Sequence, residues 1–381
     1  MSQHNPPRSP LLDHCPASLP KRFYRDPEWF RNEMRAIWAN NWIYIGRVSD
    51  IEPGTMRRKE VAGQNLILCR DAEGSVTAFH NTCRHRGAEL CSVDAKPMGK
   101  LITCPYHAWA YGTDGRLVSV AHATPTSDFR KEDNGLFPVH LHVWNGFLYL
   151  CLADHPPEFK PDLGIQALDN WPMADLITGH SLVKDLACNW KIFWENYNEC
   201  LHCPGIHPEL SDMVPVYRKG IMAANEAPDW VPGADPQTLK DDAKTWTMTG
   251  APCGPEFPDL SPDQRANGSN FVTLYPSVFV VAHVDYVRAV SLTPLSPERT
   301  RLTAEWFFAP ETLAQPGFDA ADVAEFATIV LNQDANACEM NQRGLGSDRF
   351  RQGRLMPQEF DIHHFHTWVL SQMGMTPGEI S

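Results

Sequence analysis

The chain has 381 residues, enough for two domains with cores of their own. Its formal net charge of −13 disfavours nucleic acid and anionic membranes as partners, because both repel an acidic surface. No apolar run is long enough to cross a bilayer and the N-terminus lacks a signal-peptide pattern, so we expect no membrane association. The eleven cysteines are scattered, which indicates a reducing cytoplasm with metal-bound or buried thiols.

Residues 1–41 are predicted to form a proline-rich arm and one helix. Asp26 followed by Pro27 is a typical helix start, and apolar residues then recur at helical spacing. Over residues 42–154 the pattern changes to short apolar segments separated by turn signals such as Asn145-Gly146. We therefore expect a small antiparallel β domain over this range.

The remaining residues, 155–381, are predicted to form a second domain. Its first segment, 155–164, is rich in proline and is expected to be a linker. The other expected elements are a buried helix leading to His202, an irregular stretch over 205–268, strands over 271–295 and 299–310, and a last long helix over Asp322–Arg343 ended by Gly344. A long loop between strongly patterned elements is typical of a binding wall or a lid.

Two histidines and a carboxylate lie close together in the segment NWKIFWENYNECLHCPGIH, residues 189–207. On the expected helix, Glu199 and His202 would be one turn apart on one face. The Pro-Gly pair at 204–205 would break that helix, so that His207 turns back beside His202. Two imidazoles near a carboxylate suit a mononuclear Fe(II) site, and a core helix with two hydrogen-bonded histidines is the alternative.

A second metal signature lies inside the β domain. Cys83 and His85 form a C-x-H motif, and Cys104 and His107 form a C-x-x-H motif after eighteen intervening residues, positions 86–103. Such a set binds either zinc or a Rieske two-iron two-sulfur cluster. Each half supplies one cysteine and one histidine, so both sulfurs can bind one iron and both imidazoles the other. This mixed order favours the cluster over zinc.

Three segments, FHNTCRHRGAELC, CPYHAWAYGTDGRL and NWKIFWENYNECLHCPGIHPEL, occur in this order. Together they make the chain resemble the oxygenase (alpha) subunit of the Rieske non-haem iron oxygenases. The resemblance implies an α+β protein with a Rieske-type antiparallel β domain and a catalytic domain whose antiparallel sheet is covered by helices, the helix-grip or START-like fold. It also implies that Cys83, His85, Cys104 and His107 bind a 2Fe-2S cluster.

The same resemblance assigns the mononuclear Fe(II). The segment QDANACEMNQRG, residues 333–344, is similar to the family's distant ligand helix and implies that Asp334 completes the site of His202 and His207. Reasoning from nearness alone would favour Glu199. In the family, the residue matching Glu199 instead bridges two subunits, linking the iron histidine to a cluster histidine of the neighbour.

The resemblance further implies a homotrimer in which electrons cross from one subunit's cluster to its neighbour's iron. A separate NAD(P)H-dependent reductase carrying flavin and an iron–sulfur centre would supply them. This chain itself shows no glycine-rich nucleotide-binding turn after a strand.

Within the family, the motifs look more like the oxygenases of glycine betaine and related quaternary ammonium compounds than like ring dioxygenases. This predicts monooxygenation that removes an N-methyl group, with aromatic faces holding the cation. The candidate aromatic residues are Trp194, Tyr197, Tyr275, Phe279, Trp306 and Phe307, each of which could equally be a core residue. Hydroxylation or dioxygenation of an aromatic acid, with Arg288 for its carboxylate, is one alternative. An electron-transfer iron–sulfur protein and a zinc-stabilised binding module are two others.

Two further groups are interpreted without a functional role. Cys200 and Cys203 are expected to be ordinary buried thiols. His363, His364 and His366 would alternate between the two faces of a strand, so a shared metal site is disfavoured.

Overall fold

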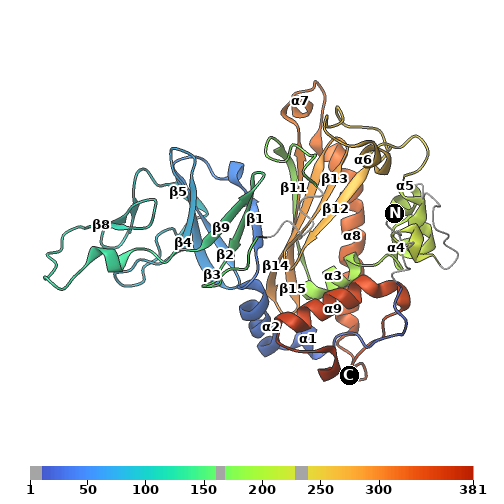
Figure 1. Cartoon of the computed structure of the whole chain (residues 1–381), viewed down its shortest axis with the longest axis horizontal. Helices are drawn as coiled ribbons and strands as arrows, with labels where there is room; N and C mark the ends of the chain where they lie inside the picture. The colour runs from blue at the N-terminus through green and yellow to red at the C-terminus, as the bar shows by residue number, and fades with distance from the viewer. Residues whose placement is uncertain (1–10, 160–167, 228–238, 381) are drawn as a thin grey trace, which may run out of the picture. The chain divides into compact units, whose positions relative to one another are not determined.

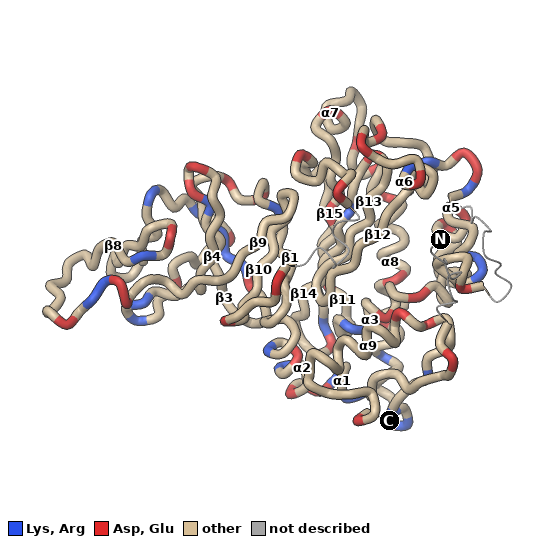
Figure 2. Tube along the Cα trace, in the orientation of Figure 1, with Lys and Arg blue, Asp and Glu red and all other residues tan. Residues whose placement is uncertain are grey.

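The computed structural model describes residues 11–159, 168–227 and 239–380 (Figure 1). Contacts between Cα atoms divide the chain into an inserted unit, Met34–Lys160, and a larger unit, Met1–Glu33 with Pro161–Ser381. The predicted linker, 155–164, lies partly outside the described residues. Within the described ranges, no helix is both long and apolar enough to span a lipid bilayer. Figure 2 shows Asp and Glu interspersed with Lys and Arg in both units.

The inserted unit consists of short antiparallel strands, as predicted. The strands form three sheets, with the orders β1-β10-β9, β4-β3-β2-β5 and β6-β7-β8. Their bounds are β1 Ile43–Arg47, β2 Thr55–Val61, β3 Gln64–Arg70, β4 Val76–His80, β5 Ala95–Pro97, β6 Ile102–Thr103, β7 Trp109–Tyr111, β8 Leu117–Val120, β9 His140–Trp144 and β10 Phe147–Cys151. Short helical turns lie at η1 Met34–Trp38, η2 Val48–Asp50 and η3 Lys131–Asn134.

The turn between β9 and β10 explains why this hairpin was predictable. Asn145 and Gly146 have φ angles of 43° and 80°. A two-residue hairpin turn with both residues at positive φ matches the twist of its strands, and Asn-Gly is the pair that tolerates it best.

The larger unit is built on one antiparallel sheet of five strands, in the order β11-β15-β14-β13-β12. The strands are β11 Ile177–Leu186, β12 Ser269–Leu274, β13 Val278–His283, β14 Val287–Ser296 and β15 Arg299–Phe308. Every residue of β13 is buried, and the buried side chains of β14 and β15 extend the same core. Continuous apolar runs in this part of the sequence therefore correspond to central strands.

Helices cover this sheet (Figure 1). The longest, α8 (Ala320–Gly344), contacts both β11 and α3 (Trp190–Tyr197). Its start is fixed by the Asp319 side chain, which accepts a hydrogen bond from the amide of Ala321. The other helices and turns are α1 Arg22–Arg25, α2 Pro27–Glu33, α4 Cys203–Ile206, α5 Pro208–Met213, η6 Pro215–Lys219, η7 Ala224–Glu226, α6 Pro262–Asn267, α7 Pro310–Leu313, η8 Pro357–Glu359, α9 Phe360–Gln372 and η9 Pro377–Glu379.

Two sequence predictions need correction here. The stretch 205–268 is not uniformly irregular, because it begins inside α4 and contains α5, η6, η7 and α6. Its residues 228–238 are outside the described part. The three C-terminal histidines belong to helix α9 and not to a strand. Ile362, Phe365 and Val369 are buried at helical spacing, a period that the adjacent histidines obscured.

A buried ion pair joins the N-terminal segment to α3. Lys191 Nζ lies 2.7 Å from Glu33 Oε1, and both side chains are fully buried. The indole groups of Trp29 and Trp190 also donate to the Glu33 carboxylate, at 2.7 Å and 2.9 Å. Burial raises the pKa of Glu33 and lowers the pKa of Lys191. Each charge is therefore tolerable inside the protein only because the other neutralises it.

We expect the Lys191→Met substitution to destabilise the protein by about 3–5 kcal/mol, because it leaves the Glu33 carboxylate buried without its counter-charge. Denaturant unfolding followed by tryptophan fluorescence measures this loss. The matched control is Arg301→Met, which breaks the exposed pair with Asp185 and should cost less than about 1 kcal/mol. An equal loss in the two variants would contradict a special role for the buried pair.

Candidate metal centres and active site

Helix α3 ends at Tyr197, earlier than the sequence suggested. It begins at an N-cap, Asn189, whose side chain accepts a hydrogen bond from the Lys191 amide. Glu199 lies beyond the end of the helix. Its carboxylate accepts hydrogen bonds from the backbone amides of Leu201 and His202, which offers the chain an alternative to helical bonding.

The Pro-Gly pair at 204–205 starts a short helix and does not break one. Pro204 is in the first turn of α4, where a missing amide hydrogen has no cost. His207 follows the last residue of α4, and its amide donates to the Cys203 carbonyl at 2.9 Å. This single helical turn brings the two histidine rings together, with 3.2 Å between their Nε2 atoms.

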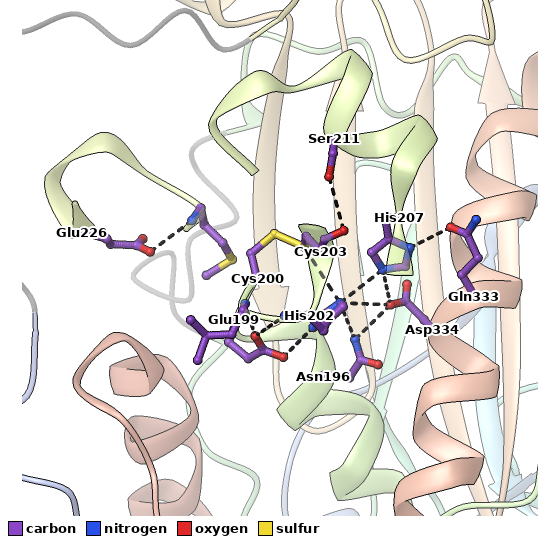
Figure 3. Close-up of a disulfide and its surroundings, with 12 residues drawn as sticks. Asn196, Glu199, Cys200, His202, Cys203, His207, Ser211, Glu226, Gln333 and Asp334 are labelled. Carbon is purple, nitrogen blue, oxygen red and sulfur yellow. Dashed lines mark hydrogen bonds and ion pairs between the residues drawn. A yellow bond between two sulfur atoms is a disulfide. The ribbon is translucent and has the colours of Figure 1, made fainter. Parts of the chain in front are cut away.

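Helix α8 supplies the carboxylate that completes this cluster (Figure 3). Asp334 Oδ1 lies 2.9 Å from His207 Nε2 and 3.5 Å from His202 Nε2. Adjacent ligands around an octahedral ion with bonds of about 2.1 Å are about 3.0 Å apart. The three donor atoms are spaced as neighbouring corners of such a site, and two histidines with one carboxylate are the donor set of non-haem Fe(II). The residues present therefore fit the ion.

The other nitrogen of each imidazole has its own acceptor. His202 Nδ1 lies 2.5 Å from Glu199 Oε1, and His207 Nδ1 lies 2.7 Å from Gln333 Oε1. The Gln333 amide is oriented in turn by donating to Glu209 Oε2 at 2.9 Å. These bonds place the protons on Nδ1, which leaves each Nε2 lone pair free for a metal.

Figure 3 shows Glu199 on one side of His202 and Asp334 on the other. Because Glu199 contacts Nδ1 while the donor cluster is formed by Nε2, its carboxylate lies outside that cluster.

The electrostatics of the cluster suit a cation. Burial lowers the pKa of His202, but hydrogen bonds to Asp334 and Glu199 outweigh it and raise the pKa to about 9. Burial raises the pKa of Asp334, yet hydrogen bonds from His202 and His207 bring it down to about 2. The Asp334 carboxylate is thus held ionised beside the His202 imidazole, which retains a proton. A bound metal takes the place of that proton.

Asn196 is a contact that the sequence analysis missed. Its Nδ2 donates to Asp334 Oδ1 at 2.9 Å and lies 3.0 Å from His202 Nε2, while its Oδ1 accepts from the thiol of Cys338. The available signal was a polar residue in a helix whose other residues are mostly aromatic or apolar.

Cys200 and Cys203 form a disulfide, so the prediction of two ordinary thiols is wrong. The Cys203 sulfur lies 3.9 Å from His202 Nε2, close enough to resemble a ligand. A sulfur bonded to another sulfur is no thiolate, however, and Asp334 is the better donor.

A cavity of about 350 Å³ opens beside the three donor residues. His202, His207 and Asp334 all line it, and most of the remaining wall is aromatic or apolar. The aromatic members are Phe193, Tyr197, Tyr217, Trp246, Phe271 and Phe279. Polar side chains in the wall include Asn198, Thr273, Arg288 and Asp361.

Of the six aromatic residues singled out from the sequence, Tyr197 and Phe279 line this cavity, with their rings stacked at 4.1 Å. The other four do not line it. The indole of Trp194 donates to the Pro276 carbonyl, and the Tyr275 hydroxyl accepts from Asn198. Trp306 and Phe307 are fully buried on β15 in the core.

The second metal signature lies in the inserted unit, on two loops with matching hydrogen bonds. In the loop between β4 and β5, the Cys83 amide donates to the Ala88 carbonyl at 2.8 Å. In the loop between β6 and β7, the Cys104 amide donates to the Trp109 carbonyl at the same distance, 2.8 Å. Four residues after each cysteine the backbone turns at positive φ, at Gly87 (75°) and Ala108 (55°). The two loops are therefore similar in form.

The four expected ligands gather on these loops. Cys83 and Cys104 are buried, while His85 is exposed and its ring centre lies 4.7 Å from that of His107. The Tyr111 hydroxyl lies 3.1 Å from the Cys83 sulfur. Two buried cysteine sulfurs and two imidazoles nearer the surface fit a Rieske cluster. In such a cluster the iron bound by the histidines lies toward the surface of the inserted unit.

No helix follows these motifs as it would in a zinc finger; η3 is the next helical turn among the described residues.

The remaining candidate cluster, His363, His364 and His366, does not converge. His366 is buried and its Nε2 lies 2.8 Å from Glu195, whereas His364 is exposed and pairs with Asp361.

Comparisons with known proteins agree with this arrangement. The family described as "Rieske [2Fe-2S] domain" matches residues 41–130, and "Ring hydroxylating alpha subunit (catalytic domain)" matches residues 173–375. The carnitine monooxygenase oxygenase subunit of Escherichia coli (strain K12) is 32% identical, with 93% of each chain covered. The glycine betaine monooxygenase oxygenase subunit of Chromohalobacter salexigens is 29% identical, with 93% of this chain and 86% of the relative covered.

Among solved structures, the quaternary ammonium Rieske monooxygenase CntA in complex with L-carnitine superposes with a TM-score of 0.69. The identity is 22%, and the match covers 94% of this chain and 96% of the other. At this identity the likeness concerns the fold alone. The two family matches and the curated relatives support more than the fold. As an oxygenase subunit, the protein uses a 2Fe-2S cluster and a mononuclear iron, and it works with a separate reductase on a small molecule. The chain belongs to the Rieske non-haem iron oxygenases.

Proposed function

We propose that this oxygenase subunit removes an N-methyl group from a betaine-like quaternary ammonium compound by O2-dependent monooxygenation. The observation that carries the proposal is the cluster of His202, His207 and Asp334, within 3.5 Å of one another, in the wall of an aromatic cavity. The names of the relatives, which act on glycine betaine and carnitine, support the same class of substrate.

In this proposal each metal has its own set of protein ligands. His202, His207 and Asp334 bind the mononuclear iron, and Cys83, His85, Cys104 and His107 bind the cluster. When bound, the ferrous ion supplies the chemistry of dioxygen binding and reduction, with electrons received singly from the cluster. Glu199 and Gln333 hold the two iron-site imidazoles in the tautomer that leaves Nε2 unprotonated.

The cavity wall performs the binding. The faces of Tyr197, Tyr217 and Trp246 attract a quaternary ammonium group, and the apolar wall keeps bulk water away from it. Insertion of one oxygen atom into an N-methyl C–H bond gives a hemiaminal, which breaks down to formaldehyde and the demethylated amine. The second oxygen atom leaves as water and takes up two electrons and two protons.

The electrons come from the separate reductase, for which we propose an NAD(P)H-dependent protein with flavin and an iron–sulfur centre. We also propose a homotrimer in which Glu199 bridges His202 to a cluster histidine of the neighbouring subunit. Its position on the Nδ1 side of His202 supports this role, since the carboxylate points away from the ligand cluster. The cytoplasmic location stays a prediction from cysteine usage.

One observation favours a second substrate class. Arg288 lines the cavity, and an aromatic acid would offer it a carboxylate while its ring packed against the aromatic wall. Naphthalene 1,2-dioxygenase shares the fold, with a TM-score of 0.66 at 18% identity, but this likeness carries no substrate argument. A pure electron carrier is disfavoured because it needs neither an open iron site nor a cavity beside it.

The substrate proposal is tested by turnover with the reductase on a panel of betaines and aromatic acids. We expect formaldehyde and the demethylated amine from a betaine, in equal amounts and matched to the NAD(P)H consumed. A hydroxylated ring product from an aromatic acid, without formaldehyde from any betaine, would establish the second candidate instead. Hydrogen peroxide, assayed in parallel, separates coupled turnover from uncoupled oxygen reduction.

The ligand assignment is tested by Asp334→Ala and Glu199→Gln. Asp334→Ala should remove the mononuclear iron and abolish turnover while the visible absorption of the cluster stays unchanged. Glu199→Gln should keep the iron, because the carboxylate lies outside the donor cluster, yet lower turnover at least about 100-fold. Metal analysis and visible spectra of both variants provide the measurement. Loss of iron from Glu199→Gln alone would identify Glu199 as the third ligand.

The trimer proposal is tested by mixing two inactive subunits. Cys104→Ser removes a cluster thiolate, so this variant should lack the visible absorption of the cluster. Asp334→Ala retains the cluster and lacks the iron. Co-expressed mixed trimers should regain activity that neither parent has, because electrons cross between subunits. Complete inactivity of purified mixed trimers would mean that transfer stays within one subunit.

A further inference from the structure

One cation in the cavity wall, Arg288, has no hydrogen-bond or ion-pair partner among the residues that the structure describes. Arg288, on β14, is only 6% exposed. Among the described residues its guanidinium makes no hydrogen bond and no ion pair, and its Nε is buried without a partner. Arginine remains charged at every physiological pH, so this charge persists in the protein.

The other two buried basic side chains of the described residues, Lys191 and Arg47, contact protein groups and do not line this cavity. Lys191 pairs with Glu33 at 2.7 Å and with Asn189 at 2.8 Å. Arg47 lies over the ring of Phe147, 4.9 Å from its centre. Arg288 alone, among the buried Lys and Arg of the described residues, faces a cavity in place of a partner. Burying a charge without a partner is costly, so its retention points to a ligand that supplies the missing charge.

Resting on the proposed function, we infer that Arg288 is the residue that selects the substrate, by pairing with a carboxylate that the substrate must carry. The guanidinium presents a planar pair of N–H donors, which matches the two oxygens of one carboxylate. The cavity of about 350 Å³ accommodates a small monocarboxylate together with its N-methyl group.

The charges of the cavity favour a zwitterion over a simple cation. A ferrous ion bound to Asp334 retains a net charge of about +1, and Arg288 adds another. A cation without a carboxylate would be repelled by both positive charges. A substrate carboxylate neutralises Arg288, so that the ammonium group can bind against the aromatic faces. Asp361, also in the wall, gives the cavity a negative group on α9. Both signs are therefore present, as a betaine requires.

The test compares glycine betaine with choline, which has the same ammonium group and no carboxylate. For the wild type we expect kcat/KM for formaldehyde release to be at least about 100-fold higher with glycine betaine. Arg288→Gln should lower kcat/KM for glycine betaine about 100-fold, mainly through KM, and should not lower the value for choline, because the substitution removes a positive charge that repels choline. Arg288→Lys, which keeps the charge and loses the planar fork, should fall between the two.

The matched control is Arg301→Gln, on the neighbouring strand β15, where the exposed guanidinium pairs with Asp185 outside the cavity. It should change neither substrate's kinetics. Thermal unfolding without substrate adds a second readout. Because Arg288 has no hydrogen bond or ion pair to lose within the described part of the chain, Arg288→Gln should not lower the melting temperature. A loss larger than that of Arg301→Gln would overturn the inference in favour of a structural role.

Equal losses of kcat/KM for glycine betaine and choline in Arg288→Gln would also overturn the inference. So would equal kcat/KM values for the two substrates in the wild type. Failure of the proposed function gives a different pattern. Binding to the iron-loaded protein, measured by calorimetry with glycine betaine and with benzoate, does not need turnover. Binding of either carboxylate that requires Arg288, without formaldehyde release, supports the carboxylate site and refutes demethylation. No binding of either at millimolar concentration refutes the site.

Discussion

The mononuclear centre depends on two hydrogen bonds that do not touch the metal position. Glu199 and Gln333 each accept from the Nδ1 of a ligand histidine, at 2.5 Å and 2.7 Å, and so decide which nitrogen is left bare. If either ring carried its proton on Nε2, that proton would point at the ion. Helices α4 and α8 together meet the requirement for an unprotonated Nε2 on each ring. Helix α4 positions both histidine rings, and helix α8 supplies Gln333 and Asp334 as consecutive residues.

Much of the chemistry was predictable from short motifs, since metal ligands must be particular side chains at close spacing. Many of the strands and helices also followed from pattern, because a buried strand such as Val278–His283 needs a continuous apolar run, whereas the fold class came from the resemblance to a family. Asp334 was different. It is 127 residues from His207, and nearness in sequence favoured Glu199, so only the resemblance to a family pointed to α8.

Other features were out of reach for physical reasons. The end of α3 is set by the carboxylate of Glu199 capturing backbone amides, a competition that periodicity does not report. The Cys200–Cys203 disulfide depends on how the turn folds as much as on the spacing. Large aromatic residues were ambiguous because core and cavity use the same side chains: Trp194 and Tyr197 are three residues apart, and only Tyr197 lines the cavity.

The N-terminal segment belongs to a unit whose other residues begin at Pro161. Tyr24 donates to Glu195, 171 residues later, and Glu33 accepts from Trp190, 157 residues later. At ribosomal rates of about 5–20 residues per second, these partners emerge roughly 10–30 seconds after the segment itself. All strand pairings of the inserted unit, by contrast, lie within Met34–Lys160. During synthesis the cluster domain can therefore fold, and present its cysteines for cluster insertion, while its host domain is still incomplete.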